Sequence, residues 1–257
     1  ARMQRYSVEQ VQERFAAPAS YALWPQAHAH TQWPGTGLKG DPAFDRFYAS
    51  QVDGIADGAE VERLNQNAGA ALLDKIGPSI LLTHSQSGPF GWLVADKRPK
   101  LVKAILALEP NGPPFREINL RGGCDWYDYQ EEVERTGGVT RIPLTFDPPL
   151  EDGEELTADL QPLSDNPELV TGYLQANPPR QLPNLQNIPI MIMVAEASYH
   201  ATYDHITSSF LKQAGVAHEL AYLANEGFKG NGHMVMLEKN NHEVADMMIN
   251  WLIENCH

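Results

Sequence analysis

The sequence predicts an α/β protein whose mostly parallel sheet is covered by helices on both faces. Four short apolar runs, at 79–83, 101–108, 188–195 and 218–224, carry this prediction. Runs of this length without polar alternation are typical of strands that are buried on both faces. Helix-like stretches at 88–96, 202–214 and 241–254 alternate with them, the order expected of parallel strands joined by helical crossovers.

The first 60 residues contain little strand-like sequence. Ser7–Phe15 predicts a short helix, because Ser7 is followed three residues later by Gln10, as in a capping box. Residues 18–42 are rich in proline, glycine, tryptophan and histidine, which predicts irregular chain. Two helices are then expected, over 43–58 and 59–76.

The alternation of strands and helices lapses between residues 110 and 187. This stretch is rich in proline, acidic residues and aromatics, and it is too long for a connecting loop. It therefore predicts an insertion that lies over one end of the sheet.

Composition excludes several classes of partner. The chain has 257 residues, 42% of them apolar, and its 19 basic and 33 acidic side chains give a formal charge of −14. Nucleic acid or an anionic membrane is not expected as the main partner, because phosphates would repel this charge. No apolar run approaches the roughly 18–20 residues that span a bilayer.

Cysteine and histidine usage argues against a metal centre. The two cysteines, Cys124 and Cys256, are too few for a disulfide-dense scaffold or a four-cysteine zinc site. They are compatible with a bond to each other, a bond to another chain, or no bond. His28 and His30 resemble a metal-binding pair, but no further ligand cluster accompanies them. We expect no metal and no organic cofactor.

A candidate nucleophile lies in the segment Thr83-His84-Ser85-Gln86-Ser87-Gly88, directly after the first apolar run and before a helix. A serine in a tight strand-to-helix turn projects its hydroxyl beyond the strand ends. The amide of the next residue, Gln86, would lie at the helix N-terminus and help to stabilise an oxyanion. The usual pattern is Gly-x-Ser-x-Gly; Thr83 and Ser87 replace its glycines but are also small.

A serine nucleophile needs a base and a carboxylate that orients the base. Among the nine histidines, His233 lies in a glycine-rich loop between the last apolar run and the last helix, from where its imidazole can reach Ser85. Two carboxylates follow buried runs: Glu109 after the second and Glu196 after the third. The residues alone leave the choice between these two open.

The segments THSQSG, LEPNG and GNGHMVMLEKNN, with HTQWPGTGLKGDPAFDRFYAS upstream, resemble the secreted serine esterases of the esterase 713-like group, which has bacterial and fungal members. The resemblance covers most of the chain. It implies an α/β-hydrolase fold, an extracellular location, and a triad of Ser85, His233 and Glu109. In that group the acid follows the strand after the nucleophile strand, which favours Glu109 over Glu196.

The resemblance also implies a division into domains. Residues 1–112 and 188–257 would form the hydrolase core, and 113–187 would form a cap. Aromatic residues of this cap, Trp126, Tyr127 and Phe146 among them, are expected either to line a substrate pocket or to form the small core of the cap itself.

One feature departs from the resemblance: no strand alternation and no glycine-rich oxyanion loop precede residue 79. The chain therefore resembles the C-terminal part of a longer protein. Cleavage of a precursor, a front half absent from the sequence, and a trimmed fold without activity would each explain this. We expect an N-terminal polypeptide to complete the sheet, because an uncovered edge and face would promote aggregation. A homodimer is also compatible with the sequence.

These residues predict hydrolysis of a small-molecule carboxylic ester or lactone through an acyl-enzyme. An alternative is a catalytically inactive, hydrolase-like subunit or binding module that completes a two-chain assembly. A third hypothesis is lyase chemistry on the same triad, without an acyl-enzyme.

Overall fold

A computed structural model describes residues 2–256 and centres on a four-stranded parallel sheet. Its strands follow the order β10 (Glu219–Tyr222), β9 (Ile190–Val194), β4 (Val102–Leu108), β3 (Ser79–His84). All four lie within the predicted apolar runs, to within one or two residues at each end. The α/β class and the parallel sheet are therefore confirmed.

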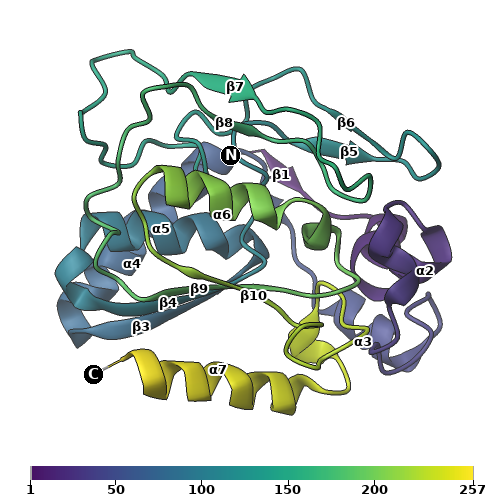
Figure 1. The fold of residues 1–257 in the computed structure, drawn as a ribbon. Coiled ribbons are helices and arrows are strands. Elements are labelled where there is room, and N and C mark those ends of the chain that lie inside the picture. Colours follow the sequence, from purple (N-terminus) through teal and green to yellow (C-terminus); the bar gives the residue numbers. More distant parts are fainter. Residues whose placement is uncertain (1, 257) are drawn as a thin grey trace.

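Helices cover both faces of this sheet (Figure 1). Helices α5 (Gly88–Lys97) and α6 (Asp204–Gln213) lie on one face, and α7 (Asn241–Asn255) lies on the other. Strand β4 separates two hydrophobic clusters: Ile105 packs on the α5 side, whereas Leu106 packs with residues of α7 such as Trp251. A strand with apolar neighbours on both faces carries no polar alternation, which is why its sequence is a continuous apolar run.

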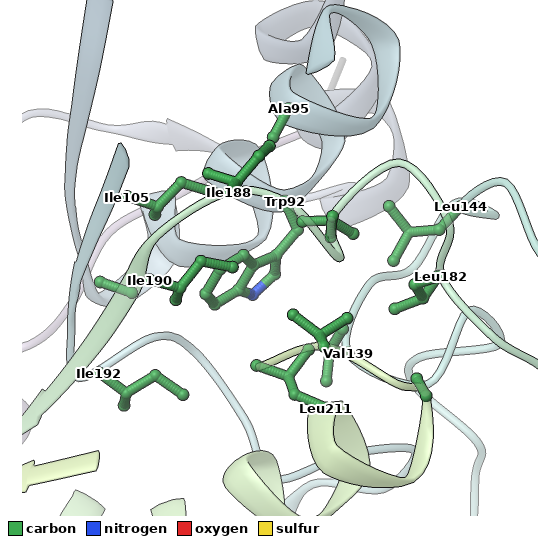
Figure 2. Packing of buried hydrophobic residues seen from close by; sticks show 14 of the residues in the cluster. Trp92, Ala95, Ile105, Val139, Leu144, Leu182, Ile188, Ile190, Ile192 and Leu211 are labelled. Carbon is green, nitrogen blue, oxygen red and sulfur yellow. The ribbon is translucent and has the colours of Figure 1, made fainter. Parts of the chain in front are cut away.

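The larger cluster surrounds Trp92 of α5 (Figure 2). Ile105 of β4 and Ile190 of β9 belong to this cluster on the sheet side, and Leu211 contributes from α6. Val139, Leu144 and Leu182 of the 113–187 segment complete the cluster. This segment is therefore packed into the main core.

Residues 113–187 contain two small antiparallel hairpins that lie above α5 and α6 in Figure 1. Strand β5 (Ile118–Leu120) pairs with β6 (Tyr127–Tyr129), and β7 (Ala158–Leu160) pairs with β8 (Tyr173–Gln175). The division into a core of 1–112 and 188–257 and a cap of 113–187 stays a prediction.

Strand β3 differs from its prediction as a strand buried on both faces. It pairs with β4 alone among the described strands, so it forms an edge of the sheet. Ile80 is 41% exposed and Leu82 is 63% exposed. The other face of β3 is covered, because Leu81 contacts the larger core and Thr83 is buried against α5. An apolar run cannot by itself distinguish a central strand from an edge strand that lacks its second neighbour.

The prediction of a single helix over 43–58 is wrong. Helix α3 (Pro42–Ala49) ends early, and Gly54–Ile55 (β2) pairs with Met3–Gln4 (β1). Asp57 then caps a new helix, α4 (Gly58–Ile76), by accepting a hydrogen bond from the Glu60 amide at 3.0 Å. An N-cap fixes where a helix begins, so α4 starts only three residues after β2 ends.

The N-terminal helix begins as predicted and ends differently. Ser7 and Gln10 form the expected capping box on α1 (Val8–Val11). The chain then continues as a π-helical turn, Gln12–Ala16, followed by the short helix α2 (Pro18–Tyr21). Isolated π-turns are frequent at functional sites, and this one carries two residues of the site described below.

Two expectations from composition can be compared with the structure. No helix within residues 2–256 is long and apolar enough to cross a membrane. Cys124 is exposed and Cys256 is half-buried, and both are free thiols.

Candidate active site

Ser85 lies at the turn between β3 and α5, in a backbone conformation that suits a nucleophile. Its φ is +53°, a left-handed value that is strained for a residue with a side chain. Two bonds between Ser87 and His84 close the turn: the Ser87 hydroxyl accepts from the His84 amide and donates to the His84 carbonyl, both at 2.8 Å. The Ser85 carbonyl accepts from the Asn111 amide at 2.9 Å, which ties the turn to the end of β4.

The replacement of the usual glycines by Thr83 and Ser87 has a steric explanation. A Cβ placed on Gly91 of α5 would lie 3.0 Å from Cγ2 of Thr83, so the glycine at 91 makes room for the threonine. A Cβ on Gly88 would lie 2.5 Å from Cα of Pro110, so this position does require glycine. The close approach of helix and strand is preserved with the glycines at different positions.

Glu109 directly follows β4 and is also left-handed, with φ +46°. Its side chain is 1% exposed. Oε1 accepts from the Ala195 amide at 2.8 Å, and Oε2 accepts from the Ser198 hydroxyl at 2.7 Å. Burial raises the pKa of Glu109, and these two hydrogen bonds oppose the rise.

His233 contacts this carboxylate. Its Nδ1 lies 2.5 Å from Oε2 of Glu109, so Nδ1 carries the proton and Nε2 is left as an acceptor. Glu196 does not take this place: its Oε2 accepts from the Gly230 amide at 2.6 Å, three residues before the imidazole. Of the two carboxylates that the sequence left open, the structure brings Glu109 to His233.

A third carboxylate, Glu238, holds the loop that carries His233. It is buried and accepts hydrogen bonds from the Gly232 amide at 2.8 Å, the Asn231 side chain at 2.7 Å and Nε2 of His30 at 2.7 Å. The imidazole therefore stands on a loop whose backbone is fixed from inside the protein.

Four rings surround the imidazole of His233. The ring centroids of Phe15, His84, Tyr199 and His200 lie 5.2, 4.5, 4.9 and 4.9 Å from its own. Burial lowers the pKa of His233 well below the ordinary value, and the neighbouring histidines and an arginine lower it further. A neutral imidazole is the form that can accept a proton.

Tyr199 lies next to His233 and lines the same cavity as Ser85. The Tyr199 hydroxyl lies 3.4 Å from Nε2 of His233. Burial raises the pKa of Tyr199, so its hydroxyl stays protonated. Within residues 2–256, the Ser85 hydroxyl has no direct hydrogen bond to His233.

A cavity of about 320 Å³ opens at Ser85. Gln86, Tyr199 and Phe15 line it next to the serine, and a cluster of charged side chains lines it as well. The three aromatic residues expected to bind substrate lie elsewhere. Phe146 is buried in the core around Trp92, and Trp126 and Tyr127 pack in a separate cluster with Trp24. Aromatic composition does not indicate which way a side chain points.

Several residues of the site escaped the sequence analysis. Arg14 and Phe15 come from the π-turn, and Tyr199 and His200 from the loop after β9. Their positions depend on tertiary packing, since the π-turn is more than 60 residues from the serine. The place of Tyr199 just beyond a buried strand is the one local signal that points to the same sheet edge.

His84, Glu109 and His233 also form a group that is compact enough for a metal ion, with ligand atoms within 4.8 Å of one another. Their polar atoms are already engaged, because Nδ1 of His233 faces Glu109 and Nε2 of His84 lies 2.8 Å from the His233 carbonyl. The donor set therefore fits a hydrogen-bonded pair better than a metal centre.

Comparison with known proteins identifies the family. The sequence model described as the alpha/beta hydrolase family matches residues 9–247. The chain belongs to the alpha/beta hydrolase family. It is 46% identical over 241 residues to the "Probable secreted lipase phiG" of Fungal sp. (strain ATCC 74256), a match that covers 93% of the chain and 64% of the relative. The chain thus spans less than two thirds of the length of this curated relative.

Solved structures with similar folds are more distant. A novel bacterial esterase is 18% identical, with a TM-score of 0.44, over 82% of the hydrolase chain and 49% of its own. A CIB-like hydrolase of Thermoplasma acidophilum is 10% identical, with a TM-score of 0.37, over 79% and 66%.

The half-buried imidazole of His84 predicts a pH-dependent stability. Burial lowers its pKa to about 4, whereas an unfolded histidine titrates near 6.5. The unfolded state therefore binds protons first, and the free energy of unfolding falls by about 3 kcal/mol between pH 6.5 and 4 on account of this residue. His84→Gln should flatten this part of the stability curve, measured by urea unfolding at several pH values.

The matched control is His242→Gln, because His242 is exposed. It should keep the wild-type pH dependence. Equal slopes for the wild type and the His84 variant would contradict the prediction. The other buried titratable groups are present in all three proteins, so their contributions cancel in the comparison.

Glu238→Gln should loosen the loop of His233. Either orientation of the new amide turns its NH₂ toward a donor, the Gly232 amide or the Asn231 side chain, and an unsatisfied buried donor costs about 1–3 kcal/mol. We expect a lower unfolding free energy together with greater protease sensitivity at residues 230–233. A variant as stable as the wild type would show that Glu238 does not hold the loop.

Proposed function

We propose that this alpha/beta hydrolase cleaves carboxylic esters or lactones through an acyl-enzyme on Ser85. The observation that carries the proposal is the Glu109–His233 pair at 2.5 Å, buried beside the strained turn that presents Ser85 to a cavity. Nucleophile, orienting acid and base follow one another along the chain in the order Ser, Glu, His, which is the order of this fold class.

In the first half-reaction His233 acts as the base. Its Nε2 takes the proton of the Ser85 hydroxyl as the oxygen attacks the substrate carbonyl. The Ser85 hydroxyl forms its hydrogen bond to Nε2 for this step, since catalytic hydrogen bonds often tighten only when substrate is bound. The imidazolium then gives the proton to the leaving alkoxide, and the acyl group stays on Ser85.

Water completes the reaction. His233 removes a proton from a water molecule, which attacks the acyl-enzyme and releases the carboxylic acid, and the proton returns to Ser85. In a lactone the alcohol stays attached to the acyl group until release. Glu109 keeps Nδ1 protonated and stabilises the imidazolium throughout.

The developing oxyanion needs donors. The Gln86 amide follows the nucleophile at the start of a helix, where backbone N–H groups lack intrahelical acceptors, and Gln86 lines the cavity. A second donor comes from a polypeptide segment outside residues 1–257. Losing one such donor typically costs roughly 10²–10³ in rate.

That polypeptide segment pairs with β3 and completes the sheet. Two observations support this arrangement: β3 is an edge strand among the described strands, and its side chains Ile80 and Leu82 are exposed on one face. A groove of about 530 Å³ beside it, lined by Leu82, Val244 and Met248, would receive the covering element. The relative with a longer chain is called a secreted lipase, and we propose an extracellular location for this hydrolase too.

The rival function is an inactive subunit or binding module. The retention of a complete hydrogen-bonded acid–base pair next to a strained serine supports catalysis instead, because an inactive chain has no reason to preserve the strain. Lyase chemistry differs in forming no acyl-enzyme.

Ser85→Ala should abolish labelling by a fluorophosphonate probe and reduce turnover of 4-nitrophenyl esters by at least about 10³-fold, because the nucleophile is lost. The matched control is Ser209→Ala, which removes a hydroxyl from α6 outside the cavity. Labelling that survives in the Ser85 variant would identify another nucleophile. Turnover without labelling in the wild type would favour lyase chemistry.

Intact mass of the native protein tests the completed sheet. We expect either a second polypeptide or a longer continuous chain, with residues of the added segment protected from hydrogen exchange next to β3. Leu82→Asp should weaken this pairing, since it places a charge in the apolar groove. Native material made only of residues 1–257, as a monomer or a homodimer, would contradict the proposal.

A further inference from the structure

The cavity at Ser85 holds a guanidinium that has no acidic partner. Arg14 projects into it from the π-turn, and its Cζ lies 5.9 Å from the centroid of the Tyr199 ring. Within residues 2–256, no carboxylate lies at ion-pair distance from Arg14, although six other arginines pair with aspartate or glutamate.

The three acids that line the cavity, Glu62, Glu117 and Glu134, all pair with arginines other than Arg14. Arg141 lies 2.6 Å from Glu134, 3.5 Å from Glu62 and 3.8 Å from Glu117. The buried Arg135 also pairs with Glu117. Glu62 further accepts hydrogen bonds from two backbone amides, at 2.8 and 3.0 Å. These acids are therefore held by their own partners, and none of them contacts Arg14.

The position of Arg14 connects it to the reacting groups. Its neighbour Phe15 stacks on the imidazole of His233, with centroids 5.2 Å apart. Tyr199, over which the guanidinium lies, contacts His233 and lines the cavity together with Ser85. A group bound by Arg14 would thus lie in the same cavity as an ester carbonyl placed at Ser85.

We propose that Arg14 binds a carboxylate on the substrate, so that the preferred esters are hemiesters and other esters with a free acid group. This inference rests on the proposed function and adds the substrate class. A guanidinium presents two parallel N–H donors that match a carboxylate, and such charge-assisted pairs are stronger and more directional than neutral hydrogen bonds. The partner that the protein does not supply to Arg14 is supplied by the substrate.

The net charge of −14 gives an anionic substrate no general attraction to the chain. The chain as a whole repels anions, but exposed charges are screened beyond about 8–10 Å in physiological salt. Within the cavity the unpaired cation acts at short range, where this screening is weak. Recognition therefore depends on one local charge.

The test compares two esters of the same skeleton with the native protein. One is the mono-4-nitrophenyl ester of glutaric acid, and the other is its methyl ester at the free acid. We expect kcat/KM to be about 10- to 100-fold higher for the acid, the range of a hydrogen bond to a charged group. Arg14→Gln should remove this ratio, mainly through KM, and Arg14→Lys should restore it in part.

Arg46→Gln is the matched control, because Arg46 is exposed on α3 and lies outside the cavity. It should keep the wild-type ratio. Equal kcat/KM for the two esters in the wild type would overturn the inference and leave ester hydrolysis standing. An equal fall in kcat on both esters in Arg14→Gln would also overturn it, since Arg14 would then stabilise the oxyanion.

A binding measurement keeps the inference independent of turnover. Glutarate should raise the thermal unfolding midpoint of the wild type and of Arg46→Gln, but not that of Arg14→Gln. If no ester is cleaved and this pattern still holds, the proposed function fails and the anion site stands. If glutarate stabilises none of the proteins or all of them equally, Arg14 is not the anion site.

Discussion

The buried carboxylate of Glu109 is the constraint on which the site depends. An ionised carboxylate away from water is unfavourable unless hydrogen bonds replace its hydration. The replacements come from separate parts of the chain: the Ala195 amide at the end of β9, the Ser198 hydroxyl in the loop that follows, and His233 after β10. Satisfying one charge therefore fixes the relative positions of three neighbouring strand ends.

The loop of His233 is held in the same way at two further points. Glu196 accepts from the amide of Gly230, and Glu238 accepts from the amide of Gly232. The two carboxylates that the sequence offered as the triad acid, Glu109 and Glu196, therefore both hold this loop. Glu109 does so through the imidazole of His233, and Glu196 through the Gly230 amide. This explains why strand-end position alone could not separate them, whereas the contacts with His233 do.

The strands of the parallel sheet could be predicted from the sequence, because the apolar composition of a strand is visible along a single stretch of chain. β4 and β9 are continuous apolar runs because both of their faces are covered, and β3 has the same composition although one face is exposed. Ser85, Glu109 and His233 could be selected because each follows a strand. Arg14 and Phe15 could not, since a π-turn distant in sequence brings them to the site only through tertiary packing.

The imidazole of His233 has aromatic surroundings, whereas the cavity beside it is lined by charged side chains. Around His233 the rings of His84, His200, Phe15 and Tyr199 exclude water, and burial keeps the pKa of each histidine low, so the base is neutral. The cavity is lined instead by paired acids and arginines and by Arg14. A long alkyl chain would gain little from burial against such a wall, because charged groups would lose hydration without new partners. In the proposed reaction, a short acyl group with a carboxylate would exchange its hydration for the guanidinium of Arg14, and the ring stack would keep His233 neutral as the base next to this polar cavity.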